Sequence, residues 1–139
     1  METINKFCPS CHREQPFEKV IEYTSVHIRK EYIPVNIISW KCPLCGEAFE
    51  DNETDFMEDA FREYRKRKGY LQPEEIKAFR KHLKLSQNEF GNLVEIGLAS
   101  VNRYENGGLQ SEAAEKALRF VMQKYSDQII ENPYSGITP

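Results

Sequence analysis

The spacing of hydrophobic and polar residues changes once along the chain, near residue 52. Residues 17–40, FEKVIEYTSVHIRKEYIPVNIISW, are rich in Val, Ile, Tyr and Thr, and their side chains fall into two alternating sets. A period of two in β-branched and aromatic residues predicts strands. We expect two or three short strands here, with breaks near Lys30 and Glu31 and near Pro34, because proline cannot donate to a strand ladder.

From Asn52 onwards the hydrophobic period becomes helical. Phe56, Ala60 and Tyr64 recur every four residues in DNETDFMEDAFREYRKRKG, where acidic residues come early and basic residues late, as a helix dipole favours. Gly69 is expected to end this helix. Further helices are predicted over residues 73–84, 86–94, 98–105 and 111–125, the first with Pro73 in its first turn.

These patterns predict an α+β protein made of two small domains. The chain of 139 residues is long enough for both. A small β-domain is expected over residues 1–51 and a linking helix over residues 52–71. An all-α domain is expected over residues 72–125, followed by an irregular tail over residues 126–139.

All four cysteines lie in two similar segments, CPSC and CPLC, which contain Cys8 and Cys11, and Cys42 and Cys45. A Cys-x-x-Cys turn presents two sulfurs, and two such turns complete a tetrahedral site that suits structural Zn²⁺. Four thiolates leave no open coordination position for catalysis. The intervening thirty residues exceed the usual spacing of such sites, but a hairpin over residues 17–40 would bring the two turns together.

Other interpretations of these cysteines compete with zinc. Iron in a rubredoxin-type site uses the same four thiolates, so the sequence does not separate the two metals. A pair of redox dithiols fits poorly, because a thioredoxin-like motif needs a βαβ frame and usually a single pair. His12 can replace Cys11 as a ligand, but with four cysteines available we expect it to be a surface neighbour.

The composition narrows the class of protein. No apolar run approaches the length of about 18 residues that a membrane span needs. The start METINKFCPS has no basic segment followed by an apolar one, so we expect no secretory signal and a reducing cytoplasm, where paired cysteines are more often metal ligands than disulfides. No Ser/His/Asp or paired-carboxylate arrangement stands out, so we predict no enzyme.

Residues 85–108, LSQNEFGNLVEIGLASVNRYENGG, have the pattern of a helix-turn-helix. Ser86 followed three residues later by Glu89 is a capping box at the start of one helix. Gly97 permits a tight turn, and Asn106 before Gly107 is a signal for the end of the second helix. Residues 73–125 contain 8 Lys and Arg against 7 Glu, so a local basic face remains possible.

Several side chains of this segment are suited to DNA. Arg103 offers a fork that matches guanine O6 and N7 and is worth about 1–3 kcal/mol of base discrimination. Ser100 and Asn102 are short hydrogen-bonding residues near the start of the second helix. Gln87 lies at a helix start, where phosphates bind, and Ala99 can meet a thymine methyl group.

The same stretch resembles the Xre/Cro-repressor family of lambda-repressor-like DNA-binding domains. The resemblance rests on LSQ at residues 85–87, on RYENG at residues 103–107, and on Arg80 in the preceding helix. It implies a partly buried structural ion pair between Arg80 and Glu105. It also implies that Arg103 faces the major groove, that Gln87 contacts a phosphate or a base edge, and that Asn106 contacts a phosphate.

Taken together, the two halves resemble the MqsA/YgiT-type antitoxin family over about residues 6–125. The strongest stretches are PEEIKAFRKHLKLSQNEFGNLV and NRYENG. The resemblance implies a type II antitoxin that represses its own operon. A homodimer would bind a palindromic operator in double-stranded DNA, and the zinc half would neutralise a toxin protein. GLQSEAAEKALRFV also resembles proteins in which these domains precede a Panacea-type antitoxin domain, which is either absent here or lies beyond residue 139.

Two other functions remain open from the sequence. One is a zinc-stabilised protein-interaction adaptor whose helical half no longer reads DNA, and the other is a regulator that uses the four thiols as a redox switch. Tyr23, Tyr32 and Trp40 can form an interface, although burial in a core is the more common role of such residues. The basic run at residues 65–68 is interpreted as the solvated end of a helix, with phosphate contact as the alternative.

Overall fold

The computed structural model describes residues 2–125, and the predicted irregular tail over 126–139 lies outside the described residues. The chain divides into two compact units, Met1–Tyr64 and Arg65–Pro139, which we call the first and the second unit. The division falls inside helix α1 (Phe56–Lys68), the element that the sequence predicts as a linking helix over residues 52–71. The model is of mixed α/β class, with a four-stranded antiparallel sheet followed by five helices.

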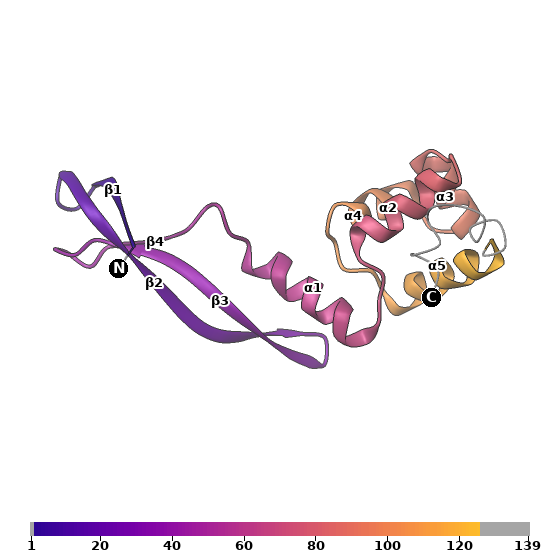
Figure 1. Ribbon diagram of the computed structural model, residues 1–139, viewed down its shortest axis with the longest axis horizontal. Coiled ribbons are helices and arrows are strands. Elements are labelled where there is room, and N and C mark those ends of the chain that lie inside the picture. Colours follow the sequence, from indigo (N-terminus) through magenta and orange to yellow (C-terminus); the bar gives the residue numbers. More distant parts are fainter. Residues whose placement is uncertain (1, 126–139) are drawn as a thin grey trace. The chain divides into compact units, whose positions relative to one another are not determined.

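The first unit is built on four strands that pair in chain order. These are β1 (Thr3–Cys8), β2 (Arg13–Ile28), β3 (Glu31–Lys41) and β4 (Ala48–Glu50). Every neighbouring pair is antiparallel. Figure 1 shows β2 and β3 as a long, twisted two-stranded ribbon that continues well beyond the short strands β1 and β4.

The strands are longer and more numerous than the sequence predicts. The break expected at Lys30 and Glu31 is the hairpin turn, but the break expected at Pro34 is wrong, because Pro34 lies inside β3 opposite Ser25. At this point β3 is paired with β2 alone, since β4 pairs only with residues 39–41. The missing N–H of a proline can therefore face an open strand edge without the loss of a ladder hydrogen bond.

The first unit buries its side chains at both ends of the ribbon and leaves the middle open. Near the cysteines, a cluster contains Cys8, Phe17, Trp40 and Cys42, with Cys11 and Phe49 packed against it. At the hairpin end, Ile28, Ile33 and Val35 are buried. Tyr23, in the middle, is 76% exposed, and Tyr32, close to the hairpin turn but on the other face from Ile33, is 68% exposed. Burial in a core, the more common role of such residues, therefore holds for Trp40 and is wrong for these two tyrosines.

The second unit is helical around a larger core. It contains α2 (Pro73–His82), α3 (Gln87–Val94), α4 (Leu98–Glu105) and α5 (Glu112–Lys124). Ser86 and Ser111 cap α3 and α5, because each hydroxyl accepts the backbone N–H three residues on. The buried residues of this core are Leu71, Ile76, Phe79, Phe90, Val94, Val101, Tyr104, Ala114, Leu118, Val121 and Met122.

The junction between α3 and α4 depends on a glycine for its close packing. A Cβ atom at Gly91 would lie 2.8 Å from the backbone oxygen of Ile96, in the connection between the two helices. Glu95 ends α3 in the left-handed conformation, and Gly97 is the N-cap of α4.

Among the residues that the structure describes, no helix has the length and apolar character of a membrane span.

Candidate metal centre and nucleic-acid interface

The two cysteine pairs lie in matching turns at the same end of the sheet. Cys8 ends β1 and begins the turn to β2, and Cys42 directly follows β3. In each turn, the residue four positions after the first cysteine donates its backbone N–H to the carbonyl oxygen of that cysteine. The N–H of His12 donates to the carbonyl of Cys8 at 2.8 Å, and that of Gly46 donates to Cys42 at 3.0 Å. His12 and Gly46 both have positive φ, the conformation that lets each turn fold back.

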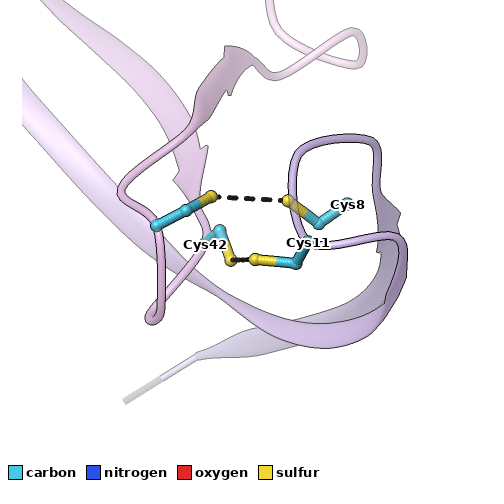
Figure 2. A group of neighbouring side chains, drawn as sticks. Cys8, Cys11 and Cys42 are labelled. Carbon is cyan, nitrogen blue, oxygen red and sulfur yellow. Dashed lines mark hydrogen bonds between the residues drawn. The ribbon is translucent and has the colours of Figure 1, made fainter.

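These turns bring the four sulfur atoms into one cluster, shown in Figure 2. The Sγ atoms of Cys8 and Cys45 are 3.5 Å apart, and those of Cys11 and Cys42 are 3.8 Å apart. All four sulfurs lie within 4.8 Å of one another. A tetrahedral Zn–S distance of about 2.3 Å requires sulfurs about 3.8 Å apart, so this donor set fits a single metal ion.

The thiols have unequal acidity, which bears on metal binding. Burial raises the pKa of Cys42, but the backbone N–H groups of Cys45 and Leu44 stabilise its thiolate and bring the pKa down to about 7. Burial and hydrogen bonds with the other three thiols raise the pKa of Cys11 to about 12. A metal ion must displace protons from such thiols, because the thiolate is the ligand.

Two side-chain hydrogen bonds lie near the cluster, and the first of them connects the two turns. The Ser10 hydroxyl donates to a carboxylate oxygen of Glu47 at 2.7 Å, and the Trp40 indole N–H donates to Asp51 at 3.0 Å. His12 is exposed and is not among the clustered ligand atoms of the described chain. The arrangement can therefore hold a metal ion with four sulfurs and no exchangeable ligand, as structural sites do.

In the second unit, α4 presents an exposed polar face. Ala99, Asn102, Arg103 and Asn106 are exposed, and their spacing of three and four residues places them on one side of the helix. The side-chain amide of Asn106 donates to the backbone and side-chain oxygens of Asn102 at 2.8 and 2.9 Å. Ser100, the remaining residue predicted on this helix, is half-buried.

Arg80 and Glu105 meet behind this face. Arg80 Nε and Nη2 donate to the two carboxylate oxygens of Glu105 at 2.7 and 3.0 Å, and Nη1 donates to the carbonyl of Leu85 at 3.0 Å. Hydrogen bonding to Glu105 raises the pKa of Arg80. The Gln87 side chain, half-buried, also donates to Glu105 at 3.2 Å. The pair thus ties the end of α4 to α2 and to the start of α3.

One buried polar network was missed by sequence reasoning. Arg65, Gln110 and Glu115 are all buried, with Arg65 only 1% exposed. Arg65 belongs to the basic run of α1, where composition alone predicts a solvated charge. The available signal was the helical phase, which places Arg65 four residues after Phe61 on the apolar side of the helix.

Comparison with protein families gives a single assignment. A family model described as "Antitoxin component of bacterial toxin-antitoxin system, MqsA" matches residues 6–131, which is most of the chain. The match confirms the resemblance to this family that the two halves of the sequence show together. No curated protein matches the chain.

Proposed function

The chain belongs to the MqsA antitoxin family, and we propose that it is an antitoxin that represses its own operon and neutralises a toxin protein. The first part of the proposal assigns DNA binding to the second unit. The second part assigns the toxin to the first unit, with Zn²⁺ as the structural metal. An antitoxin of this kind acts by binding, so we propose no catalytic role.

DNA reading is proposed for α3 and α4 acting as a helix-turn-helix. The observation that carries the proposal is the exposed face of α4, which holds Arg103 and Asn102 in a helix braced by the Arg80–Glu105 ion pair. Arg103 can donate two hydrogen bonds to a guanine, and Asn102 can pair with an adenine edge. Asn106 is proposed to contact a phosphate, Gln87 a phosphate or a base edge, and Ala99 a thymine methyl group.

A homodimer is proposed because one such helix reads only half of an operator. Two copies related by a two-fold axis place their α4 helices in successive major grooves, about 34 Å apart, and so select a palindrome. The net charge of the whole chain is −3, which makes non-specific attraction to DNA weak. Selectivity for the operator must then come from the base-reading face of α4.

The toxin is proposed to bind an uncharged face of the β2–β3 ribbon. Within residues 21–27 of β2 and 32–38 of β3, alternation places eight residues on this face, and none of them is a Lys, Arg, Asp or Glu. Tyr23 and Tyr32 are its most exposed large side chains, and the Tyr32 ring stacks on His27 with a centroid separation of 4.5 Å. Tyrosine-rich surface without charge is typical of the centre of protein interfaces. The face consists of Ile21, Tyr23, Ser25, His27, Tyr32, Pro34, Asn36 and Ile38.

Zn²⁺ is proposed as the metal of the four-cysteine centre. When bound, it would be held by Cys8, Cys11, Cys42 and Cys45 and would supply a cross-link between the two turns. Its role would be to fix the end of the ribbon that carries the uncharged face.

DNA binding is tested by fluorescence anisotropy of the full chain on its own promoter DNA and on a scrambled duplex of equal length. Arg103→Ala should lower the affinity for the promoter by about 1–3 kcal/mol and leave the scrambled duplex nearly unaffected. Lys116→Ala, which removes a 75% exposed charge on α5, is the matched control and should keep promoter selectivity. Unchanged selectivity in Arg103→Ala would favour the adaptor function instead.

Toxin binding is tested by calorimetric titration with the protein encoded by the reading frame next to the gene of this chain. Tyr23→Ala should weaken binding by about 2 kcal/mol or more if Tyr23 lies at the centre of the interface. Glu22→Ala, one residue away on the opposite face of the ribbon, is the control and should bind as the natural chain does. Equal effects of the two substitutions would refute the assignment of this face.

A further inference from the structure

We propose that Arg65 is a positioning residue for DNA reading, because it holds the turn at Gly107 and Gly108 against the stem of Arg103. The proposal rests on the proposed function, in which Arg103 reads base edges. It assigns to the buried end of α1 a role in operator selectivity that requires no contact between Arg65 and DNA.

Arg65 is hydrogen-bonded to the segment that follows α4. Its Nη2 donates to the carbonyl oxygens of Gly107 at 2.8 Å and Gly108 at 2.9 Å, and its Nε donates to the side-chain oxygen of Gln110 at 3.1 Å. Gln110 is itself buried and donates to the carbonyl of Leu71 at 2.7 Å. A planar guanidinium can donate hydrogen bonds to these acceptors at the same time. A lysine ammonium on its flexible stem cannot reproduce this fork of N–H donors.

The same turn lies directly on Arg103. The backbone N–H of Gly108 donates to the carbonyl of Arg103 at 2.8 Å. A Cβ atom at Gly108 would lie 2.4 Å from Cγ of Arg103, so the turn touches the stem of that side chain and has room only for glycine. On its other side the Arg103 guanidinium lies 5.0 Å from the ring centroid of Tyr104, a buried core residue.

Arg103 is therefore confined between Tyr104 and a turn whose carbonyls are fixed by Arg65. Base discrimination by an arginine needs its fork to be aimed along the base edge before binding, because ordering a long side chain costs conformational entropy. A turn released from Arg65 would let the Arg103 stem sample other directions. The expected loss is in selectivity between DNA sequences, with little loss of non-specific attraction.

This role differs from a phosphate contact, the other function open to a basic residue of α1. A phosphate contact requires an exposed charge and strengthens binding to all sequences equally. Arg65 is 1% exposed, whereas the neighbouring Lys66 is exposed on the same helix. The two residues carry the same charge, so Lys66 is the natural control.

The experiment measures the ratio of promoter to scrambled-duplex affinity by anisotropy for Arg65→Lys and Lys66→Gln in the full chain. Arg65→Lys keeps the charge and loses the fork, so the ratio should fall about fivefold or more while affinity for the scrambled duplex changes by less than about twofold. Lys66→Gln should leave the ratio unchanged. An unchanged ratio in Arg65→Lys with normal circular dichroism would overturn the proposal.

Two further variants separate this inference from the proposed function. In an Arg103→Ala background, Arg65→Lys should have no further effect on the ratio, because Arg65 is proposed to act through Arg103. Gly108→Ala keeps the backbone acceptors of Arg65 but displaces the Arg103 stem, so it should reproduce the loss even where Arg65→Lys folds poorly. If Arg103→Ala alone leaves the ratio intact, the proposed function fails. If Arg103→Ala lowers the ratio and Gly108→Ala does not, only the positioning role fails.

Discussion

Replacing Glu105 with glutamine should destabilise the second unit by about 3 kcal/mol, because it leaves a buried guanidinium without its counter-charge. The Glu105 side chain is 2% exposed and that of Arg80 is 12% exposed. Removal of one partner from a buried pair costs about 3–5 kcal/mol. The lower end applies here, since Arg80 keeps some contact with water and a glutamine oxygen can still accept one hydrogen bond.

The effect should be confined to one unit, and the chain provides a probe for each. Its single tryptophan, Trp40, is buried in the first unit, so its fluorescence reports the sheet. Far-UV circular dichroism reports mainly the helices. For a unit of this size the urea dependence is about 1 kcal/mol/M, so the dichroism midpoint should fall by about 3 M while the tryptophan midpoint stays in place.

The control for this prediction is an exposed ion pair of the same unit. Glu112 and Lys116 are paired at 3.2 Å with side chains 72% and 75% exposed. Glu112→Gln should shift the midpoint by less than about 1 M, because exposed pairs contribute about 0–1 kcal/mol. A Glu105→Gln shift as small as that of Glu112→Gln would refute the reasoning that burial gives the Arg80–Glu105 pair its weight.

Two further predictions concern the metal centre. Removal of the metal with a chelator should change Trp40 fluorescence, while the helical dichroism and promoter binding persist. If an oxidant abolishes promoter binding and a reductant restores it, the four thiols act as a redox switch instead. The affinity for Zn²⁺ should rise with pH between about pH 6 and 8, measured by competition with a coloured chelator, because thiols with raised pKa must lose protons to bind. Cys11, with its pKa of about 12, and Cys45, whose pKa the backbone N–H of Glu47 lowers but burial and thiol hydrogen bonds raise overall, each release a proton throughout this range. Cys42, with its pKa of about 7, adds a further proton below pH 7, so the dependence should be steeper there. A flat profile would contradict these thiol environments.

Features set by neighbouring residues could be predicted from the sequence, and features set by distant partners could not. The capping box at Ser86 and Glu89 and the sulfur pairs of the two turns depend on spacings of three residues, and both occur in the structure. The strands β1 and β4 were missed because they contain little hydrophobic alternation and exist through pairing with β2 and β3. Pro34 was interpreted as a break because an open strand edge is not visible in a sequence.

Burial was the harder property to predict, and both kinds of error occurred. Tyr23 and Tyr32 have the chemistry of core residues, yet both stay largely exposed on their face of the ribbon. Arg65 has the composition of a surface residue, yet the carbonyls of Gly107 and Gly108 provide hydrogen bonds that compensate for its burial. In both cases the missing information was how far residues more than ten positions away cover the side chain.

The two units differ in the size of the hydrophobic core that stabilises them, and this difference supports separate roles for the two units. The core of the second unit contains eleven buried residues from all of its helices, enough for a small domain to fold without a metal. The cluster at the cysteine end of the first unit contains four, and two of them are the cysteines Cys8 and Cys42. The uncharged face of Tyr23 and Tyr32 lies on strands whose ends depend on that cluster. Metal loss should therefore disrupt the proposed toxin-binding face first and leave the proposed DNA-binding face in place.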